Sequence, residues 1–428
     1  MRRAQPVSEH HHQRPPAAPK RLNLADVLMA AHSHLSDPSY PPYTRTALHK
    51  LALCRTGHFG HTVLACPGCG YGERRPRGCG LRHCPSCGHT RAEDWIKDRK
   101  LEMLDCPYYQ LVFTLPPHFY GLARENPKQI YTLLLDAVRD TLVELARDPK
   151  HLGGIPQLLL ALHTWNSRLD LHLHVHALMA AGAYNPETKS WIPAKNKAFL
   201  FSIKILSKLF RGKFLDGLKR LNAAGRLAFE YPANQALKES KEWKAFLQKG
   251  YATPFFTYVE KPAAGPENVL EYLGHYLYRT GISNGRLVSL EDRQVTFVCK
   301  DRQKRFSETG SYNRTLPLND FVDLFAQHIL PKGFHRVRFG GLWSGRHKKL
   351  LTEAKEAVAR WRVTTPAVKK PPERPPRVRK PDICPDCGRH ELQVEYIVLY
   401  DKKGVPIYRN APARAPPESP PASTNSTT

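Results

Sequence analysis

The sequence predicts an α+β protein in which a cysteine-rich ribbon precedes a core with a central antiparallel sheet flanked by helices. Three observations indicate this class. Six of the ten cysteines lie within residues 54–90. Apolar and polar residues alternate in several short runs between residues 108 and 301, and longer amphipathic segments separate these runs.

Changes in composition divide the chain into segments. We expect residues 1–20 to be a disordered lead-in and residues 21–95 to hold a helix and the cysteine-rich ribbon. Residues 105–352 carry the core. Residues 365–383 are rich in proline, lysine and arginine and predict a stiff linker, and residues 384–428 hold a further cysteine pair and a disordered tail.

The core elements follow from the spacing of apolar residues. Strands are expected at residues 108–116, 157–165, 172–182, 254–261 and 293–301, and the second and third of these form an antiparallel pair across a short polar link. Helices are expected at residues 21–53, 127–147, 198–249 (most of this range), 268–280 and 317–330.

The charge of the chain favours a polyanionic partner. There are 65 Lys and Arg against 38 Asp and Glu, a formal net charge of +27, and each neutralised phosphate releases condensed counterions. An anionic membrane is the weaker alternative, because no apolar run reaches the roughly 18 residues of a transmembrane helix. The first residues carry no apolar signal region, so we expect a cytoplasmic, nucleoid-associated protein with reduced cysteines.

Two CxxC pairs, CPGC and CPSC, lie fourteen residues apart and predict a tetrahedral zinc site. We expect a structural zinc held by Cys66, Cys69, Cys84 and Cys87, with Gly70 and Gly88 easing the turn after each pair. The alternative, free structural thiols, would require all four cysteines to fall at these spacings by coincidence. A Cys₄ set leaves no open position for catalysis.

Other potential ligands leave alternatives open. Cys54, Cys79, His61 and His83 could replace one ligand or form a second site. The separate pair Cys384–Cys387 either binds a metal with ligands from elsewhere or forms a simple turn.

Three histidines occupy one face of the strand at residues 172–182. His172, His174 and His176 alternate with apolar residues, so the imidazoles share one face. Neighbouring members are about 6.6 Å apart along the strand and the outer two about 13 Å apart. This spacing predicts a divalent-metal site of two histidines that needs a third ligand from elsewhere. The alternative is a solvated face that happens to be rich in histidine.

The expected helix at residues 268–280 carries a leucine stripe and a separate polar face. Tyr272 and Tyr276 lie at i and i+4 on that face, together with His275 and Arg279. A phenol attacks well only beside a polarised phosphate and a cation, and Arg279 is placed to supply the cation. Taken alone, the helix is better explained by tyrosines that simply flank a core, and only its combination with the histidine strand favours catalysis.

Together these segments resemble the rolling-circle insertion-sequence transposases of the HUH class that carry an N-terminal zinc ribbon and two tyrosines. The resemblance covers roughly residues 25–352. The matching pieces occur in the order CRTGHFGHTVLACPGCGYG, LRHCPSCG, QLVFTLPPH, LHTW, HLHVHALMAAGAY, EYLGHYLYRTGISNGRL, VTFVCKD and LPKGFHRVRFGGLWSGRHKKLL. Two departures are visible: Leu173 stands where the family usually has a proline, and the acidic Asp170 lies in the preceding link.

The resemblance implies that the chain nicks and rejoins single-stranded DNA at the ends of a mobile element. Mg²⁺ or Mn²⁺ on His174 and His176 would polarise the scissile phosphate, and Tyr272 or Tyr276 would attack it to leave a 5′-phosphotyrosine and a free 3′-OH. His172 and His275 are candidates for the third metal ligand. No ATP is required, and no GxxxxGK[ST] phosphate loop is present.

Three other functions remain open at this point. A replication initiator would share the active site, a zinc-dependent DNA-binding regulator would lack catalysis, and an inactive remnant would have lost it.

Overall fold

The computed structural model describes residues 21–88, 99, 101–195, 200–263, 280–301, 307–364, 382–401 and 404–410. Helices and antiparallel sheets alternate in these ranges, which confirms the α+β class. The expected tyrosine helix, with Tyr272, His275, Tyr276 and Arg279, lies outside the described residues. So do the lead-in at residues 1–20, the tail beyond residue 410 and most of the proline-rich linker.

The main sheet has five antiparallel strands in the order β12-β4-β5-β3-β8. Their bounds are β12 Val337–Gly341, β4 Gln157–Trp165, β5 Leu171–Ala180, β3 Tyr108–Thr114 and β8 Phe256–Ala263. The predicted antiparallel pair is confirmed as β4 and β5. The strand β5 lies at the centre of the sheet, which explains why most of its residues are buried.

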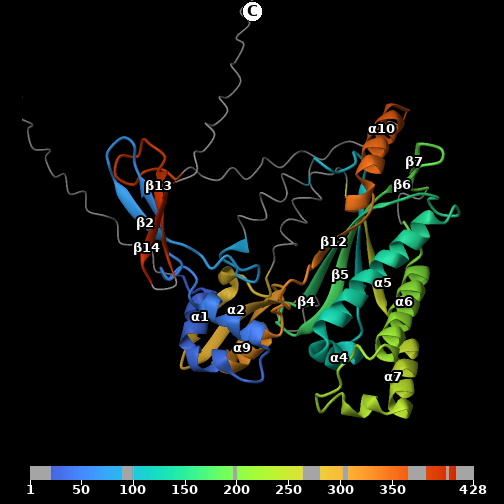
Figure 1. Ribbon diagram of the computed structural model, residues 1–428, viewed down its shortest axis with the longest axis horizontal. Helices are drawn as coiled ribbons and strands as arrows, with labels where there is room; N and C mark the ends of the chain where they lie inside the picture. Colours follow the sequence, from blue (N-terminus) through green and yellow to red (C-terminus); the bar gives the residue numbers. More distant parts are fainter. Residues whose placement is uncertain are drawn as a thin grey trace, which may run out of the picture.

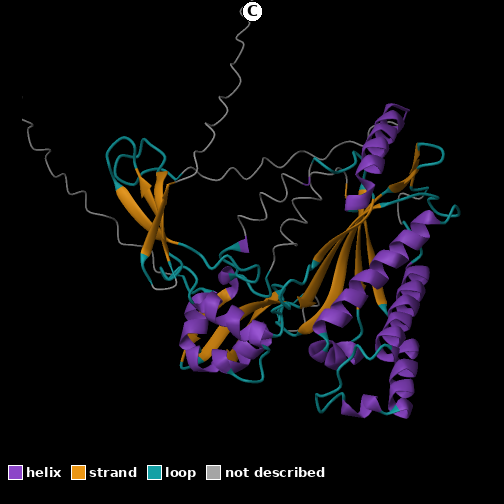
Figure 2. Ribbon diagram, in the orientation of Figure 1, coloured by secondary structure: helices purple, strands orange, loops and turns teal. Residues whose placement is uncertain are grey.

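Helices cover one face of this sheet (Figures 1 and 2). They are α4 Tyr120–Glu125, α5 Pro127–Arg147, α6 Ile203–Ala223 and α7 Ser240–Ala252. The helix α5 has the predicted bounds and begins with a proline, whose missing N–H costs nothing at a first turn. Its Leu134 and Val138 share one core with Val175 of β5 and Phe210 of α6.

The helix α10 (Lys348–Thr364) packs on the opposite face, at one end of the sheet (Figure 1). Its Ala354 and Val358 bury Leu178 and Ala180 of β5. The short hairpin of β6 (Gly182–Asn185) and β7 (Ser190–Pro193) lies beside it.

A second core joins the first helices to a later part of the chain. The helices α1 (Leu24–Ala30) and α2 (Pro42–Ala52), linked by the 3₁₀ turn His32–Ser36, pack against a small sheet and one helix. These partners are β9 Leu287–Glu291, β10 Gln294–Lys300, β11 Ser311–Pro317 and α9 Leu318–Ala326. The segment 21–95 is therefore not one unit, because its helices are buried by residues 282–329.

The tip of the β4–β5 hairpin connects the two cores. Leu169 has a positive φ of 66° and is fully buried in the second core. Its carbonyl oxygen accepts a hydrogen bond from Nε2 of His328 at 2.9 Å, and the Ser167 hydroxyl donates to the Lys300 carbonyl at 3.0 Å. These contacts hold the hairpin that carries the histidines against the second core.

A third unit joins the two ends of the described chain. Its four-stranded sheet has the order β14-β13-β1-β2. The strands are β1 His61–Ala65, β2 Gly72–Pro76, β13 Gln393–Tyr400 and β14 Pro406–Asn410. In Figure 1 the blue and red strands of this sheet stand apart from the other two units. Among the described residues, no helix is long and apolar enough to cross a membrane.

Candidate active site and metal centres

Three histidines meet on the main sheet. His163 of β4 pairs directly with His174 of β5, and His176 lies two residues further along β5. Paired residues of antiparallel strands project on the same side of the sheet, so all three imidazoles share one face. One ligand nitrogen from each ring lies within 4.8 Å of the others. This arrangement fits a metal site with three protein ligands and open positions for water or substrate.

Hydrogen bonding and stacking orient two of these rings. Nδ1 of His174 lies 2.8 Å from the carbonyl oxygen of His172 and donates to it. The lone pair of His174 Nε2 is then available to a metal, because the proton resides on the other nitrogen. The indole of Trp165 stacks on His163, with ring centroids 4.8 Å apart and an interplanar angle of 19°.

His172 is not part of this cluster, although its ring centroid lies only 4.9 Å from that of His174. The Tyr120 hydroxyl lies 3.4 Å from Nδ1 of His172, and burial lowers the pKa of His172. The described residues therefore offer His163 in the place expected for His172. The other expected candidate, His275, lies outside the described residues.

The two sides of β5 differ as the sequence predicted. Leu171, Leu173, Val175 and Ala177 are buried in the helix-covered core. On the histidine side, α10 packs over the end that holds Leu178 and Ala180. His163 and His176 are buried and His174 is half-buried, so the cluster borders solvent through His174.

The edge strand β8 presents exposed aromatic side chains on the histidine side. Thr114 of β3 pairs with both His174 and Phe256, which places one row of side chains across the sheet. Tyr258 extends the neighbouring row, which contains His176. Phe256 is 61% exposed and Tyr258 is 48% exposed. Two strand spacings, about 10 Å, separate these aromatic residues from His174 and His176.

The structure corrects the predicted grouping of the cysteines. Cys66 and Cys69 do not meet Cys84 and Cys87; the four are divided between two clusters. The physical reason is that the CPGC turn joins β1 to β2 and meets the turn at residues 384–387 before β13, whereas the CPSC turn meets Cys54 at the end of α2.

The first cluster, called the inner cluster, comprises Cys54, Cys79, Cys84 and Cys87. The Cys54 sulfur lies 3.4 Å from that of Cys84 and 3.7 Å from that of Cys87. The backbone N–H of Cys79 donates to the Cys54 sulfur at 3.4 Å, and a donor of this kind favours the thiolate that a metal binds.

The second cluster, called the terminal cluster, comprises Cys66, Cys69, Cys384 and Cys387. It brings together the first CxxC pair and the pair that had no partner in the sequence. The alternatives His61 and His83 are in neither cluster. Nε2 of His83 instead accepts a hydrogen bond from the Leu330 backbone at 3.1 Å, and burial lowers the pKa of His83 to about 3.

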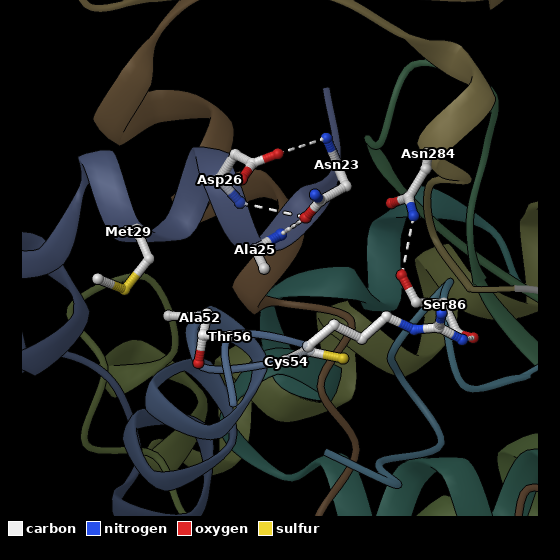
Figure 3. Close-up of a pocket in the computed structure, with 10 residues that line it drawn as sticks. Asn23, Ala25, Asp26, Met29, Ala52, Cys54, Thr56, Ser86 and Asn284 are labelled. Carbon is white, nitrogen blue, oxygen red and sulfur yellow. Dashed lines mark hydrogen bonds between the residues drawn. The ribbon is translucent and has the colours of Figure 1, made fainter. Parts of the chain in front are cut away.

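A pocket of about 480 Å³ lies where α1 meets the inner cluster (Figure 3). Asn284 bridges the two sides: its amide donates to the Ser86 hydroxyl at 2.9 Å, and its oxygen accepts from the Leu24 backbone at 3.1 Å. Nearby, the Asn23 side chain caps α1 and Asp26 bonds back to the Asn23 backbone. The inner cluster is thereby fixed to the second core.

Comparisons with known proteins agree with this architecture. Residues 27–115 match the family described as "Transposase zinc-binding domain", and residues 158–350 match the family described as "Putative transposase". The inner cluster lies wholly within the first segment and the three histidines lie in the second. No solved structure matches the chain.

Two named relatives cover most of the chain. "Putative transposase y4qJ" of Sinorhizobium fredii (strain NBRC 101917 / NGR234) is 35% identical over 329 residues, which are 76% of this chain and 79% of that protein. "Transposase for insertion sequence element IS801" of Pseudomonas savastanoi pv. phaseolicola is 27% identical over 301 residues, 69% of each chain. The chain belongs to the insertion-sequence transposases of the IS91 and IS801 type.

Proposed function

We propose that this transposase nicks and rejoins single-stranded DNA through a 5′-phosphotyrosine, in rolling-circle transposition of the HUH type. Transposases act on DNA, and the chain's net charge of +27 suits that partner. We further propose that it acts in the cytoplasm, at the nucleoid. The observation that carries the proposal is the cluster of His163, His174 and His176 on a sheet face that borders solvent.

The chemistry of this cluster suits a catalytic divalent ion. Three imidazoles leave coordination positions free for phosphate oxygen and water. When bound, Mg²⁺ or Mn²⁺ supplies Lewis-acid polarisation of the scissile phosphate. Imidazole is a softer ligand than carboxylate, so Mn²⁺ should bind more tightly than Mg²⁺. His163, His174 and His176 would hold the ion, and the bond from His174 to the His172 carbonyl keeps the ligand nitrogen in place.

The covalent step is assigned to the tyrosines of residues 268–280. The phenol oxygen of Tyr272 or Tyr276 attacks phosphorus, the bond from phosphorus to the 3′ oxygen breaks, and the departing oxygen takes a proton. The tyrosine then carries the 5′ phosphate, whose ester energy is retained for rejoining. The other tyrosine can take the next strand, and Arg279 would bind the phosphate. These assignments rest on the sequence.

The substrate should be single-stranded where it crosses the histidine face. Unpaired bases stack on exposed aromatic side chains, and each stacked base contributes roughly 1–3 kcal/mol. Phe256 and Tyr258 offer such rings about 10 Å from His174 and His176. The face of a base in a duplex is covered by the neighbouring base pairs, so a paired base cannot stack on these two rings.

We propose that the inner cluster binds the structural zinc of the zinc-binding domain. Its four sulfurs come from two segments, so a metal there would join the end of α2 to the loop at residues 79–87. Such a site folds its module and takes no part in catalysis.

A strand-cleavage assay tests the proposed reaction. Wild-type protein with Mn²⁺ and single-stranded DNA spanning the ends of the element should form a covalent adduct that survives denaturing electrophoresis. Tyr272→Phe and Tyr276→Phe should each impair the full reaction, and the double variant should form no adduct. Tyr231→Phe is the matched control, because this exposed tyrosine lies in the loop between α6 and α7, outside the main sheet.

The metal site is tested in the same assay. His163→Ala, and His174→Ala with His176→Ala, should each lower adduct formation more than about 100-fold. Losing a residue that only supports a metal ligand typically costs about 10- to 100-fold in metal affinity or activity, and losing the ligand itself should cost more. DNA binding and zinc content should persist. His32→Gln, a change at an exposed histidine in the 3₁₀ turn between α1 and α2, serves as the control. An adduct at the normal level in the double Phe variant, or in His163→Ala, would contradict the assignment.

A further inference from the structure

We propose that the terminal cluster is a second zinc site, which fastens the C-terminal segment of the chain to its N-terminal ribbon. Cys66 and Cys69 come from one end of the chain and Cys384 and Cys387 from the other. The matched families cover residues 27–115 and 158–350, so neither contains the second pair. The inference concerns folding and does not depend on the proposed cleavage reaction.

The distances between sulfurs fit a tetrahedral Cys₄ site. Those of Cys66 and Cys387 are 3.7 Å apart, and those of Cys69 and Cys384 are 3.6 Å apart. Four thiolates at the usual Zn–S distance of about 2.3 Å are separated by roughly 3.8 Å in a tetrahedron. A disulfide would require about 2.05 Å. The close contacts run between the two pairs, as expected when each CxxC turn supplies one edge of the tetrahedron.

The two turns that meet here have the same backbone form. Each reads Cys-Pro-x-Cys-Gly. The N–H of Gly70 donates to the carbonyl of Cys66 at 3.1 Å, and that of Gly388 donates to Cys384 at 3.0 Å. Both glycines have positive φ, 76° and 64°, a conformation that other residues rarely adopt. This repeated turn directs two thiolates toward a shared ion from each side.

The surrounding sheet needs such an ion, because its apolar core is small. Besides Cys66 and Cys384, only Leu64 and Leu392 form its buried cluster among the described residues. Small modules of this kind require a metal or disulfide to fold. Pairing of β1 with β13 and an ion pair between Arg75 and Asp382 align the two ends of the chain. They do not replace a hydrophobic core.

Zinc content is the first test. Purified wild-type protein should contain two zinc ions per chain by elemental mass spectrometry. Cys384→Ser with Cys387→Ser should retain one, and so should Cys54→Ser with Cys84→Ser, which disrupts the inner cluster. Cys106→Ala and Cys299→Ala are matched controls, because these buried cysteines lie outside both clusters; each should retain two.

Limited trypsin digestion is the second test, because residues 365–383 are rich in lysine and arginine. After cleavage there, the C-terminal fragment of wild-type protein should co-elute with the body on gel filtration until a chelator is added. In the Cys384→Ser, Cys387→Ser variant it should separate at once. Cys387→His should restore retention, because imidazole can replace a thiolate. A Cys384→Ser, Cys387→Ser variant that retains as much zinc as wild type, or a fragment that stays bound in that variant, would overturn the proposal.

Discussion

The position of His163 shows how strongly a single side chain depends on strand register. It faces His174 because the register of β4 and β5 pairs residue 163 with residue 174 and residue 161 with residue 176. A shift of one residue would move His163 to the helix-covered face. The sequence predicted both strands and the side on which His174 lies, but the length of the polar link does not determine the register. The third histidine of the cluster therefore could not be identified from the sequence.

The cysteines illustrate the same limit for metal sites. Each CxxC turn was recognisable from its own spacing, because the turn is local. Which turns share an ion depends on how β1 and β13 pair, and they are separated by more than 300 residues. Proximity in sequence favours Cys84–Cys87 as the partner pair, whereas the structure brings Cys384–Cys387 to Cys66 and Cys69.

A buried histidine gives a prediction about pH. His328 is fully buried, and burial lowers its pKa to about 4 from 6.5. Nδ1 of His328 accepts from the Thr164 hydroxyl at 3.1 Å and Nε2 donates to Leu169, so the neutral ring is the form that fits. Below about pH 6.5 the unfolded chain takes up a proton that the folded chain refuses until about pH 4. The stability contributed by the neutral His328 ring is thus fully present above pH 6.5 and is lost as the pH falls from 6.5 to 4.

The substitution His328→Gln tests this predicted pH dependence of stability, because the glutamine amide can keep both hydrogen bonds but does not titrate. Between pH 6.5 and 4.5 the free energy of unfolding of wild type should fall more steeply than that of the variant, by about 1.4 kcal/mol per pH unit. Urea unfolding followed by tryptophan fluorescence measures this difference. The neighbouring charges, Arg124 and Asp170, remain in both proteins. Parallel curves for wild type and His328→Gln would show that the ring is protonated in the folded state.

Among the elements, those defined by local periodicity were predicted best. The helix α5 has the bounds expected from its apolar spacing, Pro127–Arg147, and the β4–β5 hairpin was expected as such. The first helix was predicted as one segment, residues 21–53, yet the structure breaks it into α1, a 3₁₀ turn and α2. Pro38, Pro41 and Pro42 lie at this break, where they cannot continue a helix.

The edge strand β8 carries a prediction about binding. Phe256→Ala with Tyr258→Ala should weaken binding of single-stranded DNA by about 10-fold or more, because the stacking contribution of one to two bases is lost. Binding of duplex DNA of the same length should change little. Fluorescence anisotropy with labelled oligonucleotides measures both affinities.

A matched control keeps this prediction specific. Tyr231 is exposed to a similar extent, 44%, but lies in the loop between α6 and α7 and outside the main sheet. Tyr231→Ala should leave both affinities unchanged. If the β8 variant lost duplex and single-strand binding equally, the aromatic residues would be supporting the fold and would not be stacking on bases.

At the scale of the whole molecule, the arrangement depends on contacts between distant segments. The helices of residues 24–52 are buried by residues 282–329, and the strands of residues 61–76 pair with those of residues 393–410. Composition separated the chain into segments in sequence order. It could not show that the first and last segments share a sheet, because periodicity describes one element at a time.

The net charge of +27 leads to a prediction about salt that also separates two kinds of contact. Each phosphate neutralised by Lys or Arg releases counterions, so the logarithm of affinity for single strands falls by about 0.7 per phosphate for each tenfold rise in salt. A site contacting about six phosphates should lose roughly two to three orders of magnitude in affinity between 50 and 200 mM salt. Stacking on Phe256 and Tyr258 involves no counterion, so the Ala variant at these positions should bind more weakly with an unchanged slope. An affinity insensitive to salt would mean that the positive charge of the chain does not face the DNA.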